Sequence, residues 1–215
     1  MLVQPANTTD RNIINRIFKK IRITSFPPLT LPQVASLTPR EHEVRIVDDN
    51  FEKIPYDGEF DLVGITARTC TAPRAYEIAD EFRRRGVPVV MGGYHPSALP
   101  MEAKQHADSV VIGDAEDTWP KLLEDFVERR VKSFTYLTEM ERFLHLGEIL
   151  LLTTTIQATR GCPIGCRFCA LTNFPNGRRL RFRPVSDVVR EIKDMGRKFL
   201  AFVDASISVC PDYFK

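Results

Sequence analysis

The sequence predicts an α/β fold whose first part is a Rossmann-like, doubly wound parallel sheet. Short apolar runs alternate with helical segments along the first two thirds of the chain, and the connections between them are short. The run FDLVGITA (60–67) is almost continuously apolar, which is typical of a parallel strand buried on both faces. Such sheets are built from right-handed crossovers and bind ligands at the carboxyl ends of their strands.

The first 130 residues supply five strands and two helices in alternation. We expect the strands over 1–6, 42–47, 60–67, 87–93 and 108–114. The first helix covers 72–86, because apolar side chains recur there every three or four residues and Gly86 ends the pattern. The second helix covers 118–129 and closes the series. Residues 1–130 are therefore predicted to form one domain.

The remainder of the chain is predicted to be a linker followed by the start of a second domain. The periodic pattern weakens over 131–147, and a β-rich stretch over 148–159 follows it. A helix is expected over 183–196, with Pro184 in its first turn and Gly196 at its end, and a strand over 198–207. The second domain is assigned to 148–215.

The composition argues against several classes of protein. A net charge of +2 in 215 residues is too small to indicate nucleic-acid binding, and no apolar run reaches the roughly 20 residues of a membrane span. The start of the chain has no secretory signal pattern. Five cysteines, three of them crowded together, suit a metal or redox use in a reducing compartment better than a disulfide framework. We therefore expect a cytoplasmic protein that binds neither membrane nor nucleic acid.

The three crowded cysteines are Cys162, Cys166 and Cys169, in the segment ATRGCPIGCRFCAL. Thiolates bind soft metals and iron–sulfur clusters, whereas structural zinc sites use four ligands, typically in paired C-x2-C knuckles. Three thiolates on a four-iron cluster leave one iron open to another ligand. Gly161 and Gly165 suit a tight turn of the backbone around such a group. A zinc site or a purely structural cysteine loop is the alternative.

This spacing, with Phe168 before the last cysteine and Thr159-Arg160-Gly161 leading in, closely resembles the signature of radical S-adenosylmethionine (SAM) enzymes. The resemblance implies that the three cysteines hold a [4Fe–4S] cluster, that SAM chelates its open iron, and that Phe168 lies near the adenine. It further implies that SAM is cleaved to methionine and a 5′-deoxyadenosyl radical, with an electron donor such as flavodoxin or ferredoxin as partner. Asp204, at the end of a strand where many members contact the SAM amino group, is a candidate for that contact.

The segments VVMGGYHPSALP and VVIGDAEDTWPKLLE resemble cobalamin (B12)-binding domains fused to radical SAM enzymes, namely the methyltransferases and the anaerobic magnesium-protoporphyrin cyclase type. The resemblance places five residues near the corrinoid: Gly92, Gly93, His95, Gly113 and Glu116. The D-x-H-x-x-G string that brings histidine to cobalt in other cobalamin domains is absent. His95 is thus either a cobalt ligand or a local hydrogen-bonding residue, and a domain that keeps the fold without cobalamin is the alternative.

A group of arginines follows the cysteine segment in NGRRLRFR (176–183), which ends in Arg183. These arginines form either a solvated basic loop or a counter-charge for a carboxylate, and Arg183 is on that basis a candidate SAM contact. Resembling enzymes have a partial barrel of six βα units, of which this chain holds the first units, so we expect a truncated or partnered form. The predicted function is radical SAM chemistry on an unknown small molecule, with methyl transfer or cyclisation if cobalamin is bound. A noncatalytic cofactor-binding protein and a zinc-binding interaction module are the alternatives.

Overall fold

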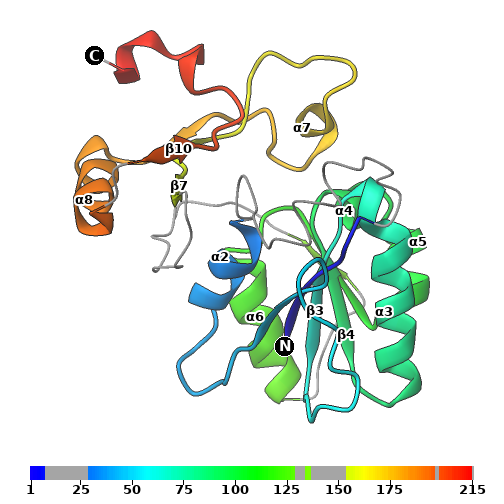
Figure 1. The fold of residues 1–215 in the computed structure, drawn as a ribbon. Coiled ribbons are helices and arrows are strands. Elements are labelled where there is room, and N and C mark those ends of the chain that lie inside the picture. The colour runs from blue at the N-terminus through cyan, green and yellow to red at the C-terminus, as the bar shows by residue number, and fades with distance from the viewer. Residues whose placement is uncertain (8–28, 129–133, 137–153, 197–198, 215) are drawn as a thin grey trace. The chain divides into compact units, whose positions relative to one another are not determined.

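The computed structural model describes residues 1–7, 29–128, 134–136, 154–196 and 199–214 (Figure 1). These residues fall into two compact units, one drawn from residues before 145 and the other mainly from residues after it. Among the residues described, no helix combines the length and apolar character needed to cross a membrane.

The first unit is a parallel sheet, as the sequence predicts. Its described strands are β1 (Leu2–Gln4), β2 (Ile46–Asp48), β3 (Val63–Thr66), β4 (Val89–Gly92), β5 (Ser109–Ile112) and β6 (Phe134–Tyr136). They lie in the order β2-β1-β3-β4-β5-β6, and every neighbouring pair is parallel. The five expected strands are present with shorter bounds. β6 is an additional strand, inside the segment 131–147 that was predicted to be a linker.

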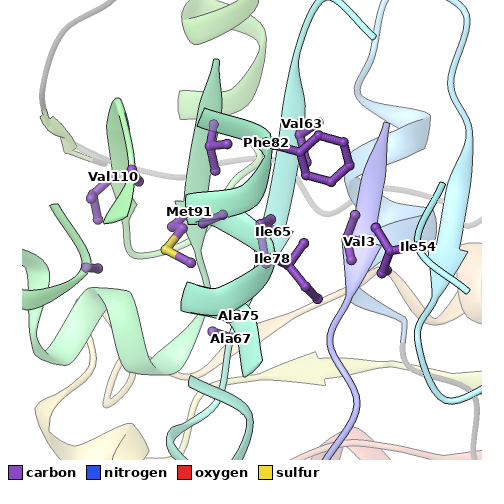
Figure 2. Close-up of a cluster of buried hydrophobic side chains, with 14 of the residues drawn as sticks. Val3, Ile54, Val63, Ile65, Ala67, Ala75, Ile78, Phe82, Met91 and Val110 are labelled. Atoms are coloured by element: carbon purple, nitrogen blue, oxygen red, sulfur yellow. The ribbon is translucent and has the colours of Figure 1, made fainter. Parts of the chain in front are cut away.

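One face of this sheet is covered by α3 (Ala72–Arg84) and α5 (Pro100–His106). Figure 2 shows Ala75, Ile78 and Phe82 of α3 directed at the strands, where they meet Val63 and Ile65 of β3 among other fully buried residues. Complete burial of a side chain such as Phe82 or Ile78 stabilises a fold by roughly 1.5–3 kcal/mol. The apolar residues that recur every three or four positions in the sequence therefore form the buried face of α3.

The opposite face is covered by α2 (Thr30–Ser36) and α6 (Thr118–Val127). Trp119 of α6 is 6% exposed, and its indole N–H donates to the Thr38 hydroxyl at 2.9 Å. Its ring lies over Gly64 of β3, where a Cβ atom would come within 3.3 Å of the indole and 2.9 Å of Leu2. Helices thus cover both faces of the sheet, and loops occupy the ends of its strands. A short 3-10 helix, η1 (Thr69–Thr71), and α4 (Tyr94–Ala98) lie in these loops.

The second unit contains a βαβ segment and a small antiparallel pair. β7 (Thr154–Ile156) and β10 (Leu200–Phe202) are parallel and are connected through α8 (Val185–Met195), which packs Val188 with Ile156 and Ala158. β8 (Thr159–Arg160) pairs with β9 (Arg181–Phe182). Three further short elements are α7 (Ala170–Asn173), η2 (Ile207–Val209) and η3 (Pro211–Phe214). The expected helix is found with closely similar bounds, and the expected strand over 198–207 is found only over 200–202. Residues 148–153 of the other expected strand lie outside the described residues.

Candidate functional site

The first candidate site is the carboxyl edge of the parallel sheet. The chain passes from β1 to β2 on one side of β1 and then crosses to β3 on the other side of β1. The strand order β2-β1-β3 therefore contains a topological switch point. Ligands of open α/β sheets bind in the crevice outside such a point. The sequence-predicted residues Gly92, Gly93, His95, Gly113 and Glu116 all lie at or after the ends of β4 and β5.

Gly93 joins the loop after β4 to the loop after β3. Its φ is +97°, and a Cβ atom there would lie 2.8 Å from the Thr66 hydroxyl and 2.9 Å from the Ala67 carbonyl. The two loops also exchange backbone hydrogen bonds, from Ala67 N to Gly92 O at 2.9 Å and from His95 N to Ala67 O at 3.1 Å. A Cβ at Gly92 would make only an ordinary contact, 3.6 Å from the nearest atom. Of the two glycines, the structure therefore requires Gly93.

The imidazole of His95 is buried at 6% exposure and takes part in a hydrogen-bond network. Tyr76 OH donates to Glu102 Oε1 at 2.9 Å and lies 2.9 Å from His95 Nε2. Because the tyrosine proton goes to Glu102, the network assigns the proton to Nε2 of His95. Nδ1 lies 3.4 Å from the Thr69 hydroxyl. Both ring nitrogens thus have protein partners in this structure, on α3, α5 and η1.

The same network shifts the pKa of its acidic members. Burial, and then the hydrogen bond to Glu102, raise the pKa of Tyr76 well above its usual value. The hydrogen bonds from Tyr76 and then His95 lower the pKa of Glu102. The ring of Tyr76 also stacks on His106, with centroids 4.1 Å apart. At neutral pH the network therefore contains a tyrosine hydroxyl and a carboxylate, and it fixes α4 against two helices.

The loop after β5 is connected to α4. Gly113 has φ of +92°, and its N–H donates to the Ser97 hydroxyl at 3.0 Å. Glu116 is 8% exposed, at the point where the loop turns into α6. The structure therefore brings the β4 and β5 loops together, and their predicted residues share one edge of the sheet.

Sequence reasoning missed an ion pair at this edge. Arg74 donates to Asp49 through Nε at 2.8 Å and Nη2 at 3.1 Å, and Ala6 N donates to the same carboxylate at 3.1 Å. The hydrogen bonds to Asp49 raise the pKa of Arg74. The two residues lie 25 positions apart, and nothing in the local sequence pattern around Asp49 identifies a partner on α3. The pair holds the ends of β1 and β2 against the start of that helix.

The second candidate site is the cysteine loop, residues 161–180, which β8 and β9 join at its base. The loop folds closely on itself: Cys162 N donates to Gly177 O at 2.9 Å, and a Cβ on Gly161 would lie 2.2 Å from Arg179 O. A Cβ on Gly177 would lie 2.1 Å from Leu171 O. Gly161 also has φ of +90°. The glycines therefore permit the contact between the two sides of the loop.

The three cysteines are unbridged and partly buried. Cys169 N donates to Cys166 O at 3.1 Å, and the Thr172 hydroxyl donates to Cys166 O at 2.7 Å. Within the described part of the chain, no three His, Cys, Asp or Glu side chains are already placed as a metal-binding group. The fit of the loop to a cluster therefore rests on its three free thiols, because cysteine thiolates are the ligands that hold iron–sulfur clusters.

The candidate SAM-binding residues differ in their surroundings. Phe168 is 94% exposed, so its ring is accessible on the loop. Arg183 is only 5% exposed, where its guanidinium forms an ion pair with Glu191 and donates to Gln157 O at 3.0 Å. Asp204 accepts hydrogen bonds from the backbone N–H groups that follow β7. A contact of any of these residues with SAM stays a prediction.

The first unit is a Rossmann-like domain, with helices on both faces of a parallel sheet. Residues 24–123 match the family described as "B12 binding domain". The match includes the loops after β3, β4 and β5, and therefore the edge that carries Gly93, His95 and Gly113.

Several known proteins to which this chain is similar are named as methyltransferases or as a methylase. Two are from Chlorobaculum tepidum: bacteriochlorophyllide d C-8(2)-methyltransferase is 40% identical over 188 residues, covering 80% of this chain and 41% of that protein. Bacteriochlorophyllide d C-12(1)-methyltransferase is 30% identical over 239 residues, covering 100% of this chain and 50% of that protein. The hopanoid C-2 methylase of Rhodopseudomonas palustris is 26% identical over 184 residues, covering 79% and 34%. The chain thus spans half or less of the length of these relatives.

Proposed function

We propose that this chain is part of a cobalamin-dependent radical SAM methyltransferase. The observation that carries the proposal is that one chain combines a B12-binding-domain match with a loop of three unbridged thiols at C-x3-C-x2-C spacing. The reaction class is supported by the relatives, which are named as methyltransferases. When bound, the cluster would supply an electron, passed on by a flavodoxin or ferredoxin, for cleavage of one SAM molecule to methionine and a 5′-deoxyadenosyl radical, and cobalamin would carry a methyl group donated by a second SAM molecule.

The residues of the second unit would hold the cluster and SAM. Cys162, Cys166 and Cys169 would each bind one iron through a thiolate, and their partial exposure leaves room for the group. Phe168 would cover the adenine, since an exposed aromatic face on the loop can stack on a flat heterocycle. The close packing of Gly161 on Arg179 would keep the two sides of the loop together around the cluster.

The residues of the first unit would hold the corrinoid at the carboxyl edge of the sheet. Gly93 and Gly113 have positive φ and turn the backbone sharply at two adjacent strand ends, which lets a large flat ligand approach the main chain. His95 would serve this edge by holding α4 to Tyr76 and Glu102, because both of its ring nitrogens already face protein partners. Its imidazole would therefore not bind cobalt.

The proposal is tested by anaerobic reconstitution of the purified chain with iron and sulfide. The reduced sample is examined by electron paramagnetic resonance (EPR) with and without SAM, and cobalamin binding is followed by absorbance. Cys166→Ala removes one proposed ligand, and Cys70→Ala removes an exposed thiol of the other unit as a matched control. We expect a four-iron signal that changes on addition of SAM, that is lost in Cys166→Ala, and that persists in Cys70→Ala.

Other results would favour the alternatives. Bound zinc without acid-labile sulfide would support a zinc-binding module. A cluster that does not respond to SAM would support a noncatalytic protein that keeps the cysteine loop as a structural element. A normal cluster in a chain that does not retain cobalamin would remove the methyl carrier from the proposal and leave the radical SAM part.

A further inference from the structure

The side chain of Asp204 continues the hydrogen bonding between β7 and β10 beyond the point where the two backbones pair. The last ladder bond runs from Val203 N to Ile156 O at 2.9 Å. Beyond it, the Asp204 carboxylate accepts from Ala158 N at 3.1 Å and from the Thr159 hydroxyl at 2.6 Å, and Thr159 N donates to the same oxygen, Oδ1. A charged acceptor therefore replaces backbone carbonyls for two successive N–H groups.

These hydrogen bonds act on the chain just before the cysteine loop. Thr159 is the first residue of β8, and Gly161 and Cys162 follow directly after that strand. Hydrogen bonds to an ionised acceptor are roughly twice as strong as neutral ones. These hydrogen bonds therefore tie the segment that enters the loop to Asp204, which follows β10.

A second group of contacts also holds this segment. Arg183 N donates to Ala158 O at 3.0 Å, and its guanidinium donates to Gln157 O at 3.0 Å while paired with the buried Glu191 of α8. Tyr213 OH donates to Arg183 O at 2.7 Å. Residues 157–159 are thus held by both the helix and the second strand of the βαβ segment.

We propose that Asp204 is a positioning residue that fixes the lead-in to the cysteine loop, and that it does not act as a SAM contact. The inference deepens the proposed function and rests on it for the role of the loop. In the alternative that the sequence suggested, the negative charge of Asp204 would attract the SAM ammonium group. The two roles differ in what they require: positioning needs the Oδ1 acceptor, whereas the ammonium contact needs the charge.

Asp204→Asn separates these roles because asparagine keeps Oδ1 and removes the charge. Oδ1 takes the bonds from Ala158 N, Thr159 N and the Thr159 hydroxyl, and Oδ2 has only a 3.3 Å contact with Ala158 N. Asp204→Ala removes both oxygens. Asp187→Asn, on the exposed part of α8, is the matched control for loss of one carboxylate in the same unit.

The first readout is amide hydrogen exchange in the metal-free chain. We expect Asp204→Ala to accelerate exchange of the Ala158 and Thr159 amides about 10- to 100-fold, the effect of losing a hydrogen bond to a charged group. Asp204→Asn should accelerate this exchange less, about 3- to 10-fold, because a neutral acceptor forms hydrogen bonds roughly half as strong, and Asp187→Asn should stay within about threefold of the wild type. If Asp204→Ala does not fold, the smaller acceleration in Asp204→Asn tests the proposal by itself. Unchanged exchange in Asp204→Ala, or in Asp204→Asn where that variant is needed, would overturn the proposal.

The second readout is the EPR response of the reconstituted cluster to SAM. The proposal expects Asp204→Asn to keep both the cluster and its response, and Asp204→Ala to assemble less cluster. Loss of the SAM response in Asp204→Asn with normal cluster content would instead make Asp204 a SAM contact and overturn the proposal. If the wild type binds no cluster, the proposed function fails, and the exchange data still decide whether Asp204 positions this segment.

Discussion

Replacement of Gly93 by alanine tests whether this residue joins the β3 and β4 loops. At φ of +97° and ψ of −171°, the backbone is in a region that is essentially restricted to glycine, and other residues are destabilised there by about 1–3 kcal/mol. The added Cβ would also lie 2.8 Å from the Thr66 hydroxyl and 2.9 Å from Ala67 O, and overpacking of this kind costs about 1–3 kcal/mol. We therefore expect Gly93→Ala to lower the free energy of unfolding by about 4 kcal/mol.

The assay is urea unfolding followed by the fluorescence of Trp119, which is the single tryptophan of the chain and is buried in the same unit. Gly86→Ala is the matched control, because Gly86 also has positive φ, of +80°, but a Cβ there would meet nothing within 4 Å. We expect this control to lose only about 1–2 kcal/mol, for the backbone conformation alone. Equal losses in the two variants would refute the argument that the loops are packed against each other at Gly93.

Two further predictions concern charged groups. Glu102→Gln should destabilise the chain most at neutral pH: the folded pKa of Glu102 lies below its usual 4.5, so its bond to Tyr76 contributes above that pH and is lost as the pH falls through the folded pKa. Urea unfolding at several pH values checks this, and a difference from wild type that does not shrink in acid would contradict it. Arg183→Met should cost about 3–5 kcal/mol because it leaves Glu191 buried without its cation, and Arg183→Met/Glu191→Leu should recover most of that loss. Denaturant unfolding followed by circular dichroism compares the two variants, and a double variant as unstable as the single one would oppose this explanation.

The parallel sheet and its longest helices could be predicted because their signals are local. The stripe of α3 and the apolar runs of β3, β4 and β5 are visible within windows of a few residues. α4 and α5 were not predicted, because Pro96 and Pro100 read as loop residues, although a proline is tolerated in the first turn of a helix. β6 was missed because three residues carry too little periodicity to be distinguished from a linker.

The candidate sites likewise contain some features that a local sequence pattern predicts and others that it does not. The cysteine spacing and the glycines at the strand ends are patterns within a single segment, so the sequence identifies them directly. The partners of Arg183 and Asp204 lie on other elements, Glu191 on α8 and Thr159 on β8, and no short-range rule indicates these pairs. The sequence could therefore point to the two charged residues, but their surroundings in the fold were needed to identify what they hold.

The closure of the cysteine loop at its base has a consequence for metal uptake. In an open chain, bringing together the ends of a segment as long as residues 161–180 opposes binding by roughly 3 kcal/mol of chain entropy. The pairing of Thr159 with Phe182 and of Arg160 with Arg181 joins those ends within the protein itself. The three thiols consequently share one closed loop, at a higher effective concentration than in an open chain, before any iron arrives. Metal binding by this loop would therefore carry less of the chain-entropy cost than metal binding by the same segment in an unfolded chain.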